Sequence, residues 1–230
     1  MDRDGLALKI KLMGYSVRHW LSDNTLIVSR GDGVRVVSIT PTDEVVFSKP
    51  YNKIESIPNA KIIGVNERNS SMWGAINSSC QLVVKPVYES YRNLTCELAE
   101  LISGSICFVV NSTGATILPA MYKKVCQLFE TPYGLVLEVI TGQSKRNVYI
   151  YDKGKSVRTE VIADWVEPNI LDEHLIYCKN DKSKLFESLN LRTLDIEGPV
   201  EFSVEDKIIK FLNTDNIIQI HSIYKRSPNI

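Results

Sequence analysis

The sequence predicts an all-β fold, a closed repeat assembly best described as a six-bladed β-propeller of small, three-stranded blades. Two copies of one motif are the first observation. Residues 72–88 read as a strand, a polar turn, a second strand, a proline and a tyrosine, and residues 106–122 repeat that order. The second observation is that short runs rich in β-branched residues recur along the chain, bounded by Gly, Asn, Asp, Ser or Pro. The third is their regular spacing, which is typical of solenoids and propellers.

The turns between these runs indicate where each repeat unit begins. We expect six units, each with an opening strand and a second strand, and a third strand in the first five. The opening strands lie 33 to 40 residues apart and contain Leu26, Ile62, Leu101, Leu135, Leu175 and Ile208. The second strands begin near Val34, Trp73, Cys107, Val148, Leu185 and Ile217. A unit of this length is slightly shorter than the ~40–45 residues of a four-stranded blade.

The sixth unit lacks a third strand, because the chain ends soon after residues 217–224. Residues 6–12 offer one, since four apolar side chains alternate there as in a half-buried strand, namely Leu6, Leu8, Ile10 and Leu12. We therefore expect residues 6–12 to pair beside residues 217–224 and close the ring, which would remove exposed strand edges. Five blades, or an incomplete ring, is the alternative.

One segment also fits a helix. Residues 92–102 would place four leucine or isoleucine side chains on one helical face, whereas the repeat makes residues 99–102 an opening strand. We favour the strand, because every other unit begins with one. No break in composition divides the chain, so the sequence predicts a single domain over residues 1–230.

The repeated motif resembles that of WG-repeat (KWG-type) proteins. Their units run Trp-Gly-x-Ile-Asn, a short turn with Gly, a Val/Ile strand, then Pro and Tyr. The first copy keeps the dipeptide as Trp73 and Gly74, and the second keeps the turn glycine as Gly114. The match is clear over about residues 34–128, less than half of the chain. The resemblance implies a β-rich repeat protein and transfers no catalytic residue.

Composition argues against several function classes. The chain has 27 basic and 27 acidic side chains, without the basic excess that phosphate binding needs, so nucleic acid is not an expected partner. No apolar run approaches the ~20 residues of a membrane helix, and the N-terminus does not read as a secretory signal. Five cysteines at irregular spacing predict buried, reduced thiols. We expect a cytoplasmic protein that does not associate with membranes.

Catalytic motifs are missing from the sequence. It has no HExxH, GxSxG, GxxxxGK[ST] or GxGxxG pattern, and its three histidines are too widely spaced for a local metal site. Cys107 and Cys126 fall in apolar strands, where a thiol is inert, and Cys80 in a polar turn is the most exposed candidate for a redox role. We predict no catalytic residue, no metal and no cofactor.

Aromatic residues outside the repeat are the first candidates for a binding site. Trp73 and its equivalents in other units are expected to pack within blades. Three further aromatics fall in predicted connections, where binding function is more common than on scaffold strands. These candidates for a protein-recognition surface are Trp20, Tyr133 and Trp165.

Three functions follow from these observations. The leading hypothesis is a non-enzymatic protein-interaction module that presents loops on a rigid propeller to a protein partner. The alternative is a small-molecule or carbohydrate-binding propeller, possibly hydrolytic, that uses its central funnel. Its polar ligands would be Glu160, Asp164 and His174. The third hypothesis is a structural subunit of a larger assembly.

Overall fold

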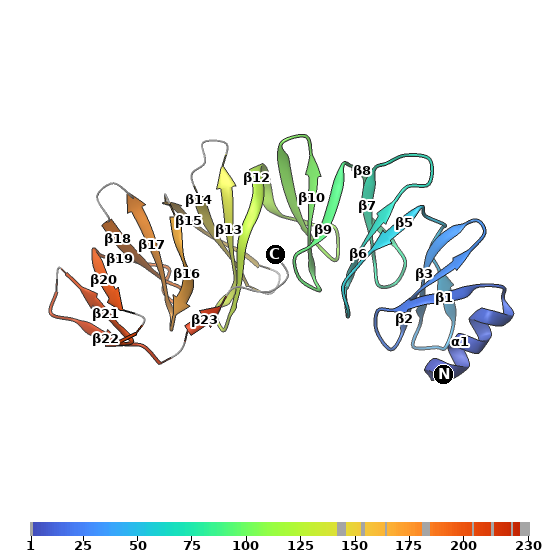
Figure 1. Cartoon of the computed structure of the whole chain (residues 1–230), viewed down its shortest axis with the longest axis horizontal. Coiled ribbons are helices and arrows are strands. Elements are labelled where there is room, and N and C mark those ends of the chain that lie inside the picture. Colours follow the sequence, from blue (N-terminus) through green and yellow to red (C-terminus); the bar gives the residue numbers. More distant parts are fainter. Residues whose placement is uncertain are drawn as a thin grey trace. The chain divides into compact units, whose positions relative to one another are not determined.

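A computed structural model describes the backbone of residues 2–141, 146–152, 155–163, 165–180, 185–203, 205–212, 214–221 and 223–225. Within these residues the chain forms 23 strands and one helix, so the predicted all-β class is confirmed (Figure 1). The contacts divide the chain into two compact units, unit 1 (Met1–Ala120) and unit 2 (Met121–Pro228). The single domain over residues 1–230 stays a prediction.

Unit 1 contains three antiparallel meanders, in which neighbours in sequence are neighbours in the sheet. The first comprises β1 (Ser16–Trp20), β2 (Thr25–Arg30), β3 (Gly33–Ile39) and β4 (Val45–Phe47). The second comprises β5 (Lys53–Glu55), β6 (Ile62–Asn66), β7 (Trp73–Asn77) and β8 (Leu82–Tyr88). The third comprises β9 (Ser90–Asn93), β10 (Leu98–Ser103), β11 (Ile106–Asn111) and the start of β12 (Thr116–Thr131).

Unit 2 begins within β12, which is therefore shared by two meanders that count as one seven-stranded sheet. The strands that follow β12 in it are β13 (Gly134–Thr141), β14 (Arg146–Asp152) and β15 (Lys155–Ala163). The next sheet has β16 (Trp165–Leu171), β17 (His174–Asn180), β18 (Leu185–Asn190) and β19 (Ile196–Glu197), with β23 (Ile223–Lys225) added beside β16. The last sheet has β20 (Val200–Ser203), β21 (Ile208–Phe211) and β22 (Ile217–Gln219).

The predicted phase of the repeat is confirmed, but the predicted three-stranded blade is wrong. All six predicted opening strands are present, as β2, β6, β10, β13, β17 and β21, and each is followed by its predicted second strand. Residues 98–103 form a strand paired with β11, which settles the choice between helix and strand. A further strand precedes each opening strand, so a complete unit has four antiparallel strands, as in a propeller blade. The fold is an all-β repeat of propeller-type blades.

The predicted strand at residues 6–12 is also wrong, because Arg3–Leu12 form helix α1. Asp2 caps this helix, since its carboxylate accepts a hydrogen bond from the backbone N–H of Gly5 at 2.8 Å. Leu6 and Ile10 share one helical face and are fully buried in one apolar cluster with side chains of β2 and β3. Figure 1 shows α1 against this first meander. Residues 6–12 therefore do not pair with β22, and the predicted ring closure by this segment is wrong.

A recurring turn produces the repeat signal that the sequence shows. The side-chain oxygens of Asn77 and Asn111 each accept backbone N–H groups from the residues two and four positions later, at 3.0 Å. Three residues after each asparagine the backbone is left-handed, at Cys80 (φ 64°) and at Gly114 (φ 83°). Asp43 has the corresponding conformation between β3 and β4 (φ 60°). Such Asx turns favour a tight connection between the second and the following strand.

The repeat aromatics pack within the cores, as expected. The ring of Trp73 stacks on that of Tyr91, with ring centroids 6.0 Å apart, beside a buried cluster from the second and third meanders. Tyr122, the repeat equivalent of Tyr88, lies edge-on to Tyr149 with centroids 5.3 Å apart in unit 2. The aromatics of the motif therefore serve packing between neighbouring strands and sheets.

Candidate functional site

The predicted recognition aromatics do not share one environment. Trp20 is the last residue of β1 and not in a connection, and the guanidinium of Arg3 lies 5.2 Å from its ring centroid. It is half-buried against the α1 cluster of unit 1. Trp165 begins β16, with its backbone opposite Cys178, and its side chain lies outside the described residues. Tyr133 does lie in the turn between β12 and β13, half-buried.

The predicted funnel ligands are also dispersed. Glu160 lies in β15, where only the backbone is described, and Asp164 lies outside the described residues. His174 begins β17 and is 2% exposed, with its Nδ1 3.0 Å from Ser188 Oγ. His174 and Tyr133, which the sequence assigned to different hypotheses, line one cavity in unit 2.

This cavity has a volume of about 550 Å³ and lies beside β22. We call it the acidic cavity; its lining is Tyr133, Asp172, Glu173, His174, Ile217, Ile218, Gln219 and His221. Glu173 is held at its rim by Tyr133, whose hydroxyl donates to Glu173 Oε2 at 3.4 Å, and by the side chain of Asn190, which donates to Oε1 at 3.3 Å. Asp172 Oδ2 accepts the backbone N–H of His221 at 2.7 Å. Both carboxylates therefore have fixed positions.

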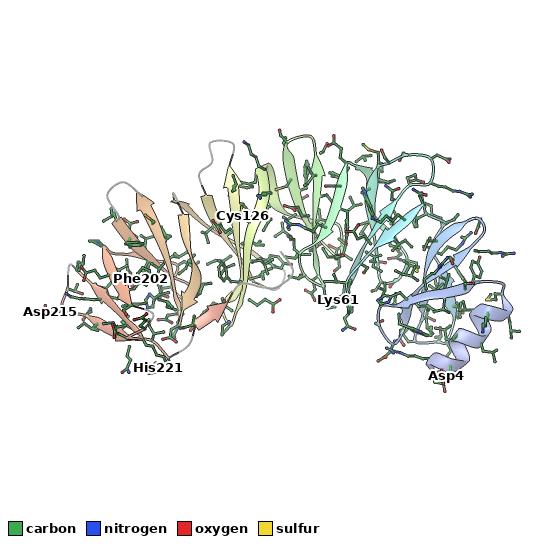
Figure 2. The ribbon with its side chains drawn as sticks, viewed as in Figure 1. Asp4, Lys61, Cys126, Phe202, Asp215 and His221 are labelled. Carbon is green, nitrogen blue, oxygen red and sulfur yellow. The ribbon has the colours of Figure 1, made fainter. Side chains whose placement is uncertain are left out.

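A second cavity lies at the other end of β22. We call it the turn cavity; it measures about 460 Å³ and is lined by Glu197, Gly198, Phe211, Thr214, Asn216, Ile217 and Ile218. Glu197 Oε2 lies 3.8 Å from Nδ1 of His174. This contact joins the two cavities, because Glu197 lines the turn cavity and His174 lines the acidic cavity. Figure 2 labels Asp215 and His221, which bracket the segment that carries β22.

β22 is an edge strand. Its sheet has the order β20-β21-β22, and in the part of the chain that the structure describes no strand pairs with its other side. The backbones of Asn216 and Ile220 bond toward β21, at 3.1 Å and 2.7 Å. Because backbone groups of alternate residues point to opposite edges of a strand, Ile218 also faces β21. The N–H and C=O groups of Ile217 and Gln219 therefore point to the open edge.

The β22 edge combines three features that suit an extended ligand. It offers unpaired backbone groups, an apolar contact at Ile217 that is 61% exposed, and a cavity at each end. The cavities bring three carboxylates to the edge, from Asp172, Glu173 and Glu197, and no lysine or arginine is among the described residues that line them. Sequence reasoning missed this site, although its signal was present. The repeat phase already left the sixth unit one strand short.

Burial disfavours the thiolate form of two cysteines, Cys80 and Cys107. Burial raises the pKa of the Cys80 thiol to about 11, and its Sγ lies 3.4 Å from the carbonyl oxygen of Val36. Burial likewise raises the pKa of Cys107 to about 12. Cys80 is therefore less exposed than its place in a polar turn suggested, and the prediction that Cys107 is inert is supported.

We expect both thiols to react slowly with alkylating reagents in the native protein. A raised thiol pKa means that the thiolate is scarce below pH 9, so labelling of Cys80 and Cys107 by iodoacetamide at pH 8 should be at least about tenfold slower than in urea. Mass spectrometry of the two peptides measures this. Equal rates in both conditions would show that the thiols are accessible.

Two searches of the described residues identify no further functional feature. They contain no group of three or more His, Cys, Asp or Glu side chains placed to hold a metal ion. None of the helices described there is long and apolar enough to cross a membrane.

Comparisons with known proteins add structural neighbours only. No protein-family model matches the sequence, and no curated protein matches it. Among solved structures, the chain is similar to Hsv2 of Kluyveromyces marxianus, at 12% identity and a TM-score of 0.33, over 90% of this chain and 72% of that one. It is similar to Hsv2p of Kluyveromyces lactis, at 12% identity and a TM-score of 0.33, over 84% and 69%. The WD40 domain of SCAP from fission yeast gives 9% identity and a TM-score of 0.30, over 90% and 64%.

These similarities are too low to inform function. The assignment of the chain as an all-β repeat protein with propeller-type blades rests on its own strand order and pairing.

Proposed function

We propose that the protein is a non-enzymatic interaction module that binds an extended segment of a partner protein along β22. The observation that carries the proposal is the three-stranded sheet of β20, β21 and β22 in a chain whose earlier units have four strands. An extended peptide that adds to a sheet edge gains backbone hydrogen bonds, and pockets for its side chains give specificity. The β22 edge offers both.

The other units indicate what kind of strand fits. Apart from the shared β12, strands at the corresponding end of complete units range from two residues in β19 (Ile196–Glu197) to nine in β15 (Lys155–Ala163), and they contain β-branched residues. A partner segment needs only about three paired residues to cover the three residues of β22. We infer a segment with Val, Ile or Thr at alternate positions, since such residues pack well on a pleated surface.

The charges indicate a basic side chain in that segment. Glu173 and Asp172 are half-buried in the acidic cavity, and Glu197 lies in the turn cavity. A lysine or arginine that enters either cavity would meet a carboxylate in a partly desolvated setting, where a charge-assisted hydrogen bond is stronger than at an open surface. The same charges would repel an acidic segment, which gives selectivity.

A peptide selection tests this proposal. Random peptides displayed on phage would be selected on the full chain, and the selected peptides would be measured against Gln219→Pro. Proline removes the outward N–H of Gln219, and it is tolerated on an edge strand where that N–H faces solvent. We expect the selected peptides to contain β-branched and basic residues. Their affinity for the Gln219→Pro variant should be about tenfold lower, because one backbone hydrogen bond and the close approach of the peptide at that bond are lost.

Gln219→Ala is the matched control, because it removes the same side chain and keeps the N–H. It should bind the peptides as the unaltered chain does. Glu173→Gln should weaken basic peptides and leave neutral ones unchanged. Peptides that bind Gln219→Pro and Gln219→Ala equally would place the binding surface elsewhere and contradict the proposal.

The relation to WG-repeat proteins remains a proposal of the same kind. Its support is the Asx turn with a left-handed residue at Gly114 and the packing of the dipeptide at Trp73 and Gly74. Any protein with this turn and with two strands this close together would show the same features for the same physical reasons.

A further inference from the structure

A third cavity, in unit 1, has a different chemistry and is independent of the β22 edge. It lies between the first two meanders and has a volume of about 360 Å³. Thr25 at the start of β2 and Ser38 near the end of β3 line it on one side. Lys61, just before β6 and labelled in Figure 2, and Ser78, after β7, line it on the other. We call it the hydroxyl pocket.

Its lining is almost entirely polar. Only Ile39 and Ala60 among the lining residues are apolar, and the others carry hydroxyl, amide or ammonium groups. No carboxylate and no aromatic ring belongs to this lining. Hydroxyl and amide groups can each donate and accept hydrogen bonds, so they match a ligand whose own groups do both.

Two residues of this lining carry hydroxyl groups that make no hydrogen bond with the described part of the chain. Thr25 is 4% exposed and Ser38 is 9% exposed, and they lie opposite each other in the pairing of β2 with β3. Among the described residues, neither hydroxyl makes a hydrogen bond. The next pair along the two strands, Leu26 and Val37, is fully buried and apolar. Because both residues line the cavity, their hydroxyl groups are available there to bond water or a ligand.

The pocket carries little net charge. The ammonium group of Lys61 lies 2.5 Å from Glu97 Oε1, and this hydrogen bond raises the pKa of Lys61, so the lysine stays charged and paired. An anionic ligand would need a cation that is not already compensated. A neutral ligand needs only the hydroxyl and amide groups, and these are present in excess.

We propose that the hydroxyl pocket binds a small, neutral, polyhydroxylated ligand of the monosaccharide or cyclitol class. Its hydroxyl groups bond to Thr25 and Ser38 at the buried end, and to Ser78 and Asn59 near the mouth. No aromatic ring of the lining stacks on the ligand, so hydrogen bonds alone hold it, and a dissociation constant on the order of 1 mM is expected.

Nitrogen-15 NMR titration of the full chain tests the proposal. The probes are D-glucose, D-galactose, D-mannose and myo-inositol, each added up to about 50 mM, with sodium phosphate as a separate arm. We expect at least one probe to give saturable shifts confined to the amides around the pocket. Thr25→Val should weaken that probe at least about tenfold, and Ser38→Ala should weaken it several-fold. Ser16→Ala, an exposed serine of β1, should leave it unchanged.

Stability separates a binding role from a structural one. Thr25→Val replaces a hydroxyl that has no partner by a methyl group, so it should keep or raise the free energy of unfolding while it weakens binding. No saturable shift with any of the four probes overturns the proposal, and so does a shift that Thr25→Val leaves unchanged. Saturation by phosphate alone also overturns it, in favour of an oxyanion site.

Discussion

Gly74→Ala is expected to lower the free energy of unfolding by about 3 kcal/mol. A Cβ atom at Gly74 would lie 2.5 Å from the carbonyl oxygen of Val84 and 2.7 Å from the backbone nitrogen of Pro86. These are backbone atoms of β8, which pairs with β7 through a local irregularity, so neither can move away without disturbing the sheet. Glycine is therefore needed at position 74 for a steric reason, the close approach of β8, and not for catalysis.

Chemical denaturation with urea, followed by circular dichroism, measures this effect. Gly31→Ala is the matched control, because no atom lies within 4 Å of a Cβ atom there, and it should change stability by less than about 0.5 kcal/mol. If Gly74→Ala and Gly31→Ala lower the free energy of unfolding by the same amount, the close approach of β8 to Gly74 would be contradicted.

Leu6→Ala and Ile10→Ala are each expected to destabilise unit 1 by about 2–5 kcal/mol. Both side chains are fully buried against the first meander, and alanine is the best helix former, so the loss reports on packing and not on helix propensity. Leu8→Ala should have little effect, because Leu8 is 60% exposed on the opposite side of α1.

The same three variants separate a helix from a strand at this position. In a strand, Leu6 and Leu8 would share one face, so Leu6→Ala and Leu8→Ala would lower the free energy of unfolding by similar amounts. In the helix, positions four apart are equivalent, so Leu6 should resemble Ile10. Urea denaturation of the full chain gives the comparison, and equal losses at Leu6 and Leu8 would contradict the docked helix.

The misassignment of residues 6–12 has a definite physical origin. Leucine and isoleucine at every second position satisfy a strand pattern, and two of them, four apart, also satisfy a helix. The deciding signal was Asp2, whose carboxylate caps the first turn of α1. An Asp four residues before Leu6 is a residue type preferred at helix N-caps, and it favours a helix over a strand there.

Two of the strands that sequence reasoning missed have little apolar alternation. β5 (Lys53–Glu55) and β9 (Ser90–Asn93) each have few apolar residues, and they exist because β6 and β10 supply pairing partners. The opening strands were predictable because they are the most buried. β6 has all five residues buried, for example. In these two units, tertiary pairing therefore added a strand that local sequence does not specify.

The candidate site was harder to predict than the fold. Tyr133 and His174 were singled out for different reasons, and the structure brings them to one cavity beside β22. Ile217, which forms the apolar contact of that edge, was read only as the start of a second strand. An edge strand is defined by what does not pair with it, so the number of strands in each repeat unit can indicate one, whereas a local sequence pattern cannot.

Amide hydrogen exchange along β22, resolved by NMR with and without a selected peptide, tests the central claim most directly. In the free chain, the amides of Ile217 and Gln219 should exchange fast and that of Ile218 slowly, because only Ile218 faces β21. Peptide binding should slow exchange at Ile217 and Gln219 and leave Ile218 as it was. Peptide binding that leaves Ile217 and Gln219 unprotected, with slowed exchange elsewhere, would contradict strand addition at β22.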